Sequence, residues 1–327
     1  MCKTVVDVKN LLANPEFEID VPVTGTFGAE IGKPRSGQNG VAYYPVDLWD
    51  YTGSVRAFAP KTDWQGILPG PRSTLDCGIE LRRDRHGQAQ AVLRPTRETD
   101  NPRSSIELLP GHVAPNVEDL ERLVDLASAL RTPAYRAFLE NVFCDQSFTR
   151  LFVTLPASKS CHHTDAGGLL AHSLEVAEAI KAATRELPNT PELFAEAAVV
   201  VALLHDAGKV LLRGPAGHRY PCRHHDHDHL LELALSGPLT RLKQTNQNAT
   251  GVLWGTIKAY QSGDTYNMPL AGVIRGLDGT SAQNSGLKTH LTSNPGYYWT
   301  KLGGRRPVWI PPELNHPGVP WTGQNLP

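Results

Sequence analysis

The feature of this sequence that most limits its fold is the segment TPELFAEAAVVVALLHDAGKV, residues 190–210. Thr190 followed by Pro191 is typical of a helix start. The second half of the segment is nearly all apolar, and a helix that is apolar on every side has to be buried on every side. We therefore expect this helix to be the central one of a bundle.

The central helix ends in an adjacent histidine and aspartate, His205 and Asp206. Burying this pair costs several kcal/mol unless the charges are compensated. A divalent cation is a common compensation, because imidazole and carboxylate both donate to it. The simpler alternative is a helix C-terminus with a capping histidine, a glycine cap at Gly208 and a solvated Lys209.

Two further residues fit as ligands of the same ion. The 33 residues from His172 to His205 accommodate one helix, a turn and a returning helix, which places the two histidines side by side. Asp278 interrupts the apolar segment PLAGVIRGLDGTSA and offers a carboxylate from a later helix. The alternative for Asp278 is the N-cap of a following turn. The sequence thus predicts a metal centre with the ligands His172, His205, Asp206 and Asp278.

The hydrophobic periodicity changes once along the chain. From about residue 17 to residue 95, apolar residues alternate in short runs between Gly-containing turns, which predicts a small β-barrel or sandwich. The proline-rich stretch 94–116 has little periodicity and indicates a linker, and helical patterns follow it. We expect an α+β chain with three parts, which are a β domain with its linker over 1–110, an all-α domain over 111–285 and an irregular tail over 286–327.

The composition is that of a globular chain, with 40% hydrophobic and 20% charged residues and a formal net charge of -1. This charge gives no overall attraction to nucleic acid, although it does not exclude a local basic groove. The five scattered cysteines indicate free thiols in a reducing compartment. Because no signal peptide or membrane-length apolar run is present, we expect a cytoplasmic protein without a membrane partner.

The predicted β domain carries aromatic residues that could stack on nucleic-acid bases. The candidates are Tyr44, Trp49 and Phe58. Exposed aromatic rings on such a domain are typical platforms for single-stranded nucleic acid. The strand alternation also turns some of the aromatic residues into the core, so both interpretations are open at the level of sequence.

The order and setting of the four predicted ligands resemble the H…HD…D pattern of the HD-domain metal-dependent phosphohydrolases. Within residues 150–285, the stretch PASKSCHHTDAGGLLAHSLEVA is similar to a motif of two HD subfamilies. One comprises the YhaM-type 3′→5′ exoribonucleases, which join an N-terminal OB-fold to an HD domain. The other is the HD domain of TraI/MobH-type conjugative relaxases. The resemblance implies an OB-like barrel followed by an HD-type helical bundle.

The resemblance also implies roles for individual residues. His172, His205, Asp206 and Asp278 would bind Mn²⁺, or else Mg²⁺, Fe²⁺, Co²⁺ or Ni²⁺, and the ion would activate a water for attack on phosphate. Lys209 would pair with a phosphate oxygen. His162 and His163 would approach the phosphate or protonate the leaving oxygen.

A second metal is an open point in this comparison. The YhaM-type pattern has further histidines before its last aspartate. Here the interval holds RHHDHDHLL, residues 223–231, and Trp254 stands in a helix where a histidine is expected. His225 and His229 are the candidates for a second metal, and the alternative is a solvated polar loop.

The activity implied by the resemblance is that of a metal-dependent phosphodiesterase. The preceding β domain favours a polymer as substrate, so we expect a 3′→5′ exonuclease on single-stranded RNA or DNA. One alternative is a relaxase-like, site-specific DNA nuclease of a conjugative element. Others are an accessory nucleic-acid-binding protein with a catalytically weak HD domain, and a small-nucleotide phosphohydrolase. A homo-oligomer is compatible with each of them.

Overall fold

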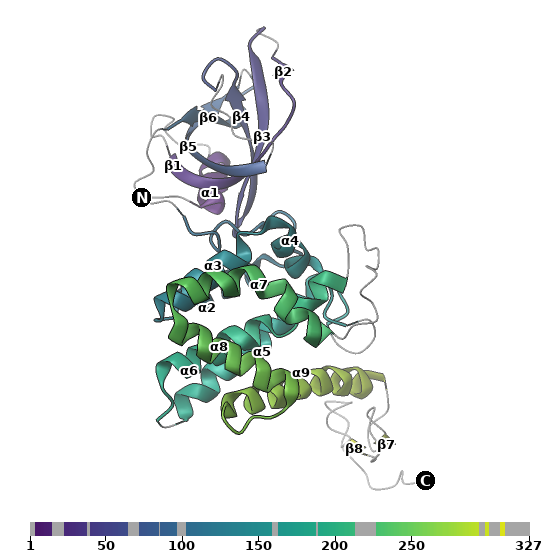
Figure 1. The fold of residues 1–327 in the computed structure, drawn as a ribbon. Coiled ribbons are helices and arrows are strands. Elements are labelled where there is room, and N and C mark those ends of the chain that lie inside the picture. The colour runs from purple at the N-terminus through teal and green to yellow at the C-terminus, as the bar shows by residue number, and fades with distance from the viewer. Residues whose placement is uncertain are drawn as a thin grey trace. The chain divides into compact units, whose positions relative to one another are not determined.

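The structure is a computed structural model. It describes residues 4–14, 23–37, 40–64, 72–84, 86–96, 103–158, 163–187, 189–212, 227–293, 298–300 and 308–310, with side chains left out at 72–73, 227–229 and from 284 on. The chain divides into two compact units, Met1–Val153 and Thr154–Pro327. Strands occupy much of the first unit and helices fill most of the second, so the predicted α+β class is confirmed (Figure 1).

The strands of the first unit close into a barrel. Its members are β1 (Val23–Ile31), β3 (Ala42–Asp50), β4 (Gly53–Pro60), β5 (Arg72–Arg83) and β6 (Ala89–Pro95). Around the barrel the order is β1, β3, β4, β6, β5 and back to β1, with β4 and β6 parallel and all other neighbours antiparallel. The short β2 (Arg35–Ser36) pairs with β3. Of the barrel or sandwich that the alternation predicts, the structure shows the barrel, and its strand order is OB-like.

Alternate side chains of the strands fill the barrel. Helix α1 (Val5–Ala13) adds two valines to this core, and the indole N–H of Trp64 donates to the carbonyl oxygen of Leu93 at 3.1 Å. The largest fully buried strand residues are Phe27, Leu48, Ile79 and Leu93. Because successive residues of a strand face opposite sides, the same alternation that predicted strands also selects this core.

A buried carboxylate, that of Asp50, joins three segments of the first unit. It is 0% exposed and accepts hydrogen bonds from the backbone N–H of Val5 at 2.9 Å, from the backbone N–H of Thr52 at 2.8 Å and from the guanidinium of Arg103 at 2.6 Å. Arg103 belongs to the proline-rich stretch, where Leu109 is also buried. From Arg103 on, this stretch is therefore packed in the first unit and is not a free tether.

Helices follow the barrel in the first unit. They are α2 (Val117–Ser128), α3 (Pro133–Phe143) and α4 (Gln146–Thr154). Asn116 caps α2, accepting the N–H of Glu118 at 3.2 Å. The rings of Phe143, Phe148 and Phe152 pack together between α3 and α4.

The second unit is a helical bundle. Its helices are α5 (Gly168–Glu186), α6 (Glu192–Leu204), the 3₁₀ helix η1 (Ala207–Leu212), α7 (His227–Thr245), α8 (Gln247–Ser262) and α9 (Pro269–Ser293). Helix α6 contacts α5, α8 and α9, and every residue from Glu196 to Leu204 is buried. The prediction of a central apolar helix is therefore confirmed.

Helix α9 continues past the point where an irregular tail was expected. The tail was predicted from residue 286, whereas α9 ends at Ser293. Leu287 and Leu291 are four residues apart and continue the helical spacing, which the abundance of polar residues concealed. Beyond α9, β7 (Tyr298–Thr300) pairs antiparallel with β8 (Val308–Ile310). None of the described helices has the length and apolar character needed to cross a bilayer.

Candidate metal centre

All four predicted metal ligands meet in the second unit. His172 comes from α5, His205 ends α6, Asp206 follows it and Asp278 lies on α9. The Nε2 atom of His172 is 3.1 Å from Oδ1 of Asp278 and 3.8 Å from Oδ2 of Asp206. The Nε2 atom of His205 is 3.6 Å from an oxygen of each carboxylate. The antiparallel pairing of α5 and α6 thus places the two histidines together, as the spacing predicts.

The hydrogen-bond network assigns the same tautomer to both imidazoles. The Ser281 hydroxyl donates to Glu175 Oε2 at 2.8 Å, so it accepts from Nδ1–H of His172 at 3.2 Å. Nδ1–H of His205 donates to the carbonyl oxygen of Ala202 at 2.7 Å. Both rings therefore direct Nε2 at the carboxylates, and an outer hydrogen bond that fixes the ring in this way is typical of metal-binding histidine.

The centre is buried and lacks one polar partner. His172 and His205 are each 1% exposed and Asp206 is 2% exposed. Among the described residues, Nε2 of His205 has no hydrogen-bond partner, since 3.6 Å to the carboxylates is too long for one. Donor atoms of His172, His205 and Asp206 lie within 4.8 Å of one another. Two imidazole nitrogens beside two carboxylates suit a divalent transition metal, so the residues present fit such an ion.

The electrostatics of the centre favour a positive charge between these groups. Burial lowers the pKa of His205, but Asp206 and Asp278 outweigh burial and raise the pKa above its ordinary value. Burial acts to raise the pKa of Asp278, but the adjacent imidazoles of His172 and His205 hold it well below its ordinary range. Asp278 is therefore ionised at neutral pH. A cation beside Nε2 of His205, whether a proton or a metal, is stabilised by both carboxylates.

Lys209 lies in η1, at the edge of the centre. Its ammonium forms an ion pair with Oδ2 of Asp206, the same oxygen that faces both histidines. The Lys209 side chain is 21% exposed, whereas that of Asp206 is 3% exposed. Lys209 therefore offsets the charge of the buried Asp206 while keeping contact with solvent.

His163 lies against the same centre in an unusual backbone conformation. Its φ is 45°, in the left-handed region that residues other than glycine seldom adopt. Its Nε2–H donates to Glu175 Oε2 at 3.1 Å, and its ring centroid is 5.5 Å from that of His172. His163 is thus linked to the candidate metal centre through Glu175. His162 lies outside the described residues.

Gly168 makes this position of His163 sterically accessible. A Cβ on Gly168 would lie 2.1 Å from the carbonyl oxygen of His163, so Gly168→Ala is expected to displace that backbone and lower the free energy of unfolding by about 1–3 kcal/mol. Urea unfolding measures the change. The matched control is Gly276→Ala in α9, where the added Cβ meets nothing within 4 Å and no loss of stability is expected. Equal stability of the two variants would contradict the steric argument.

Sequence reasoning missed the residues that support the ligands. Glu175 lies three residues after His172, and Ser281 lies three residues after Asp278, so each shares a helix face with a predicted ligand. This spacing in the sequence could have indicated Glu175 and Ser281 as neighbours of the predicted ligands. Tyr260 of α8 donates its hydroxyl to Oδ2 of Asp278 at 3.2 Å, and no local pattern in the sequence announces that contact.

The residues predicted for a second metal cannot be compared with this geometry. His225 lies outside the described residues, and His229 belongs to α7 but its side chain is not described. Within the described part of the chain, His163, His172 and Glu175 form another group whose donor atoms lie within 4.8 Å of one another.

The aromatic residues predicted to bind nucleic acid have different surroundings in the barrel. Trp49 is 5% exposed and packs on His112, with ring centroids 4.7 Å apart, so its faces are not open to a base. Tyr44 packs partly buried against the core. Phe58 is half-buried and meets the ring of Tyr43 edge to face, with centroids 5.4 Å apart.

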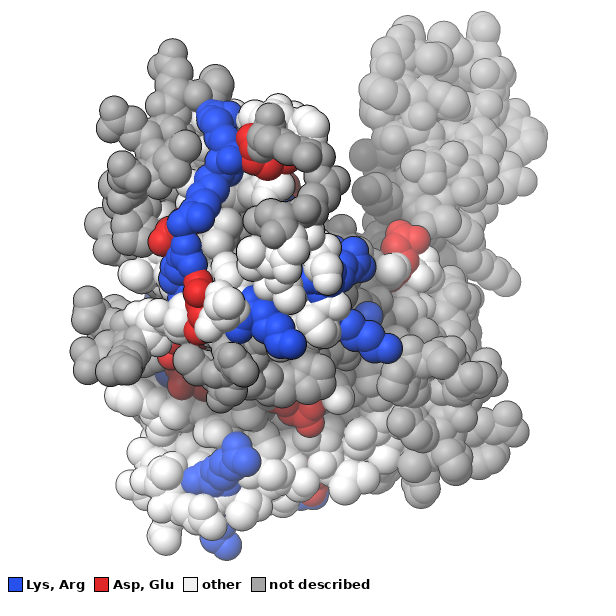
Figure 2. Space-filling model, turned by 90° about the horizontal axis from the view of Figure 1, so that it is seen from above, with Lys and Arg blue, Asp and Glu red and all other residues white. Residues whose placement is uncertain are grey.

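Basic residues lie near Tyr43 and Phe58. Arg35 is paired with Tyr43 across β2 and β3, and the backbone of Lys61 bonds to Ala42. Figure 2 shows a row of Lys and Arg side chains on one face, with acidic side chains beside it. Several arginines of the barrel are paired with acids, such as Arg56 with Asp47, which reduces the positive charge they offer to a ligand.

Residues 120–213 match one family model. This model is TraI_2, described as "Putative helicase", and it covers less than a third of the chain. The match includes His163, His172, His205 and Asp206 and ends before Asp278. This part of the chain is therefore similar to a family described as putative helicases. No curated protein and no solved structure matches the chain significantly.

Proposed function

We propose that this protein is a metal-dependent phosphodiesterase that degrades single-stranded nucleic acid from the 3′ end, with Mn²⁺ as the preferred ion. The proposal rests on one observation above all. Two buried imidazoles direct Nε2 at two carboxylates, and Nε2 of His205 has no hydrogen-bond partner among the described residues. A divalent ion held by His172, His205, Asp206 and Asp278 would satisfy all four groups.

The surrounding residues have separate tasks in this proposal. When bound, the ion would lower the pKa of a water and polarise a phosphate oxygen. Ser281 keeps the proton of His172 on Nδ1, and Tyr260 orients Asp278. Lys209, at the accessible edge, offers its ammonium to a non-bridging phosphate oxygen. His163 holds a proton on Nε2 that a leaving oxygen can accept.

The barrel supports a polymeric substrate. Tyr43 and Phe58 offer partly exposed ring surface, and Arg35 and Lys61 lie near them on the neighbouring strand and turn. Aromatic rings interleaved with cations bind single strands by stacking and by attraction to phosphate. RNA and DNA both satisfy this chemistry.

The TraI_2 match favours a second candidate, a site-specific DNA nuclease of a conjugative element. Neither Gly-Lys pair of the chain, Gly32-Lys33 or Gly208-Lys209, is followed by Ser or Thr as in the phosphate-binding P-loop. Strand separation driven by a nucleoside triphosphate is therefore not part of either candidate function. Both candidates are based on strand cleavage at the metal centre, and they differ in where the strand is cut.

The test uses 5′-labelled single-stranded RNA and DNA oligomers with Mn²⁺ or with chelator. The proposal expects a metal-dependent ladder of 5′-labelled products that shorten with time. A single product at one sequence would instead support the relaxase-like candidate. Absence of any cleavage with intact binding would contradict both and leave a binding role.

A further inference from the structure

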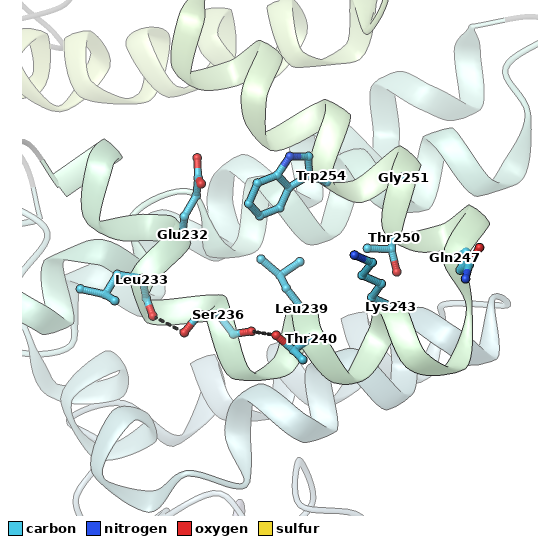
Figure 3. A pocket seen from close by; sticks show the side chains of 10 residues that line it. All are labelled: Glu232, Leu233, Ser236, Leu239, Thr240, Lys243, Gln247, Thr250, Gly251 and Trp254. Carbon is cyan, nitrogen blue, oxygen red and sulfur yellow. Dashed lines mark hydrogen bonds between the residues drawn. The ribbon is translucent and has the colours of Figure 1, made fainter.

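A groove separates α7 from α8 on a part of the bundle that the metal centre does not use. Figure 3 shows it between one face of α7 and the facing side of α8. Its volume is about 830 Å³, within the range typical of ligand pockets. Trp254 and Leu239 form its apolar middle, and Lys243 lies toward the turn that joins the helices (Figure 3).

Trp254 provides a fixed aromatic surface in this groove. The residue is 39% exposed, which is unusual for so large an apolar side chain. The ammonium of Lys258 lies over the indole at 5.2 Å from the ring centroid and is itself paired with Glu232. This pairing restrains the indole and neutralises Glu232, the one acidic side chain among the described residues that line the groove.

The polar groups of the groove fit a ligand with N–H donors and a negative charge. The hydroxyls of Ser236, Thr240 and Thr250 donate to backbone carbonyls, so toward the groove their oxygens can only accept hydrogen bonds. Lys243 points into the groove in Figure 3, and the structure gives it no ion pair within the described residues. Of the charged side chains described at the groove, Lys243 is therefore the one without an opposite charge.

The spacing of these groups matches a nucleotide. Thr250 lies beside Lys243 near the turn (Figure 3), and Trp254 is four residues further along α8, a rise of about 6 Å. A flat ring stacked on Trp254 would thus have its anionic group roughly one helical turn away, comparable with the distance between base and phosphate in one nucleotide. An amphipathic helix would fill the apolar middle, but it would pair with Lys243 only if it also carried an acidic side chain at that point.

We propose that this groove binds one nucleotide, with its base stacked on Trp254 and its phosphate at Lys243. The inference deepens the proposed function and rests on it for the identity of the ligand as part of a strand. Tyr260, which contacts the metal ligand Asp278, is six residues after Trp254 on α8, about 9 Å along the helix axis. Because six residues are about 1.7 turns of helix, the two side chains leave different faces of α8, and the groove would hold a nucleotide of the strand other than the one being cleaved.

The test measures binding without metal, so that no cleavage interferes. Fluorescence anisotropy with a labelled single-stranded oligomer in chelator compares wild type with Trp254→Ala and Lys243→Ala. Trp254→Ala is expected to weaken binding about tenfold, and Trp254→Phe, which keeps a ring, to restore most of it. Lys243→Ala is expected to weaken binding and reduce the slope of log Kd against log salt by about one. Lys181→Ala, in α5, is the matched control and should bind like wild type.

Competition with adenosine monophosphate distinguishes the two sources of the ligand. Displacement of the oligomer by the free nucleotide, lost in Trp254→Ala, would show that the groove takes free nucleotides as well. Trp254-dependent binding of the oligomer without such competition would show that it takes a nucleotide only within a strand. The proposal would be overturned if Trp254→Ala and Lys243→Ala bound the labelled strand as tightly as wild type. If these variants changed only the association state of the protein, the groove would be a protein interface instead.

These experiments test the groove proposal and the nuclease proposal independently of each other. Trp254-dependent binding in chelator with no cleavage in Mn²⁺ would contradict the nuclease proposal and leave the groove. Cleavage in Mn²⁺ together with binding that is unchanged in Trp254→Ala would contradict only the groove proposal.

Discussion

Replacement of Asp206 by Asn is expected to lower the rate of metal-dependent cleavage by at least about a thousandfold. The variant keeps the volume of the side chain and removes the charge that faces both histidines and Lys209. Loss of one ligand charge weakens both the binding of the ion and the activation of its water. Initial rates on a 5′-labelled oligomer measure the loss of activity, and the rise in melting temperature on adding Mn²⁺ measures the binding of the ion.

The control for Asp206→Asn is Asp264→Asn, which changes an exposed aspartate in the loop between α8 and α9. This variant should keep the wild-type rate and the wild-type response to Mn²⁺. Cleavage by Asp206→Asn within about tenfold of wild type would show that the reaction does not depend on this centre. Far-ultraviolet circular dichroism of each variant separates loss of activity from loss of fold.

Replacement of Asp50 by Ala is expected to lower the free energy of unfolding of the barrel by about 3–5 kcal/mol. The change leaves Arg103, whose side chain is 6% exposed, without its carboxylate. It also removes the acceptor for the N–H groups of Val5 and Thr52. Equilibrium unfolding in urea, followed by a probe in the barrel, measures the loss.

The control for Asp50→Ala is Asp47→Ala, in the same strand. Asp47 pairs with Arg56, but the two side chains are 46% and 56% exposed, so the expected loss is about 0–1 kcal/mol. Similar losses in the two variants would contradict a special role for the buried carboxylate. Asp50→Asn, which keeps part of the hydrogen bonding, should lie between the two.

Much of the fold could be predicted because its periodicities are local. Alternation over residues 17–95 predicted a barrel, and the apolar run of α6 predicted a central helix. The end of α9 was misjudged, because the many polar residues of this segment leave a weak hydrophobic pattern in the sequence. The role of Arg103 was also missed, since its partner Asp50 is 53 residues earlier and no periodicity connects them.

At the candidate site, too, local patterns could be predicted and contacts made by tertiary packing could not. The predicted ligands His172 and His205 could be brought together from helix lengths alone, and Asp278 could be added from its position in an apolar segment. Tyr260 could not, because its contact with Asp278 depends on the packing of α8 against α9. The burial of Trp49 depends likewise on His112, which lies outside the predicted strands.

The Asp50 cluster has a consequence for how this chain acquires its structure during synthesis. The last strand of the barrel ends at Pro95, yet the cation that neutralises the buried Asp50 is supplied by Arg103. A nascent chain that has released only the strands would hold an unpaired charge in its interior. We therefore expect the barrel to become stable only once Arg103 and the segment after it have left the ribosome, rather than when the last strand has. A series of stalled nascent chains of increasing length, probed with protease, would locate that step.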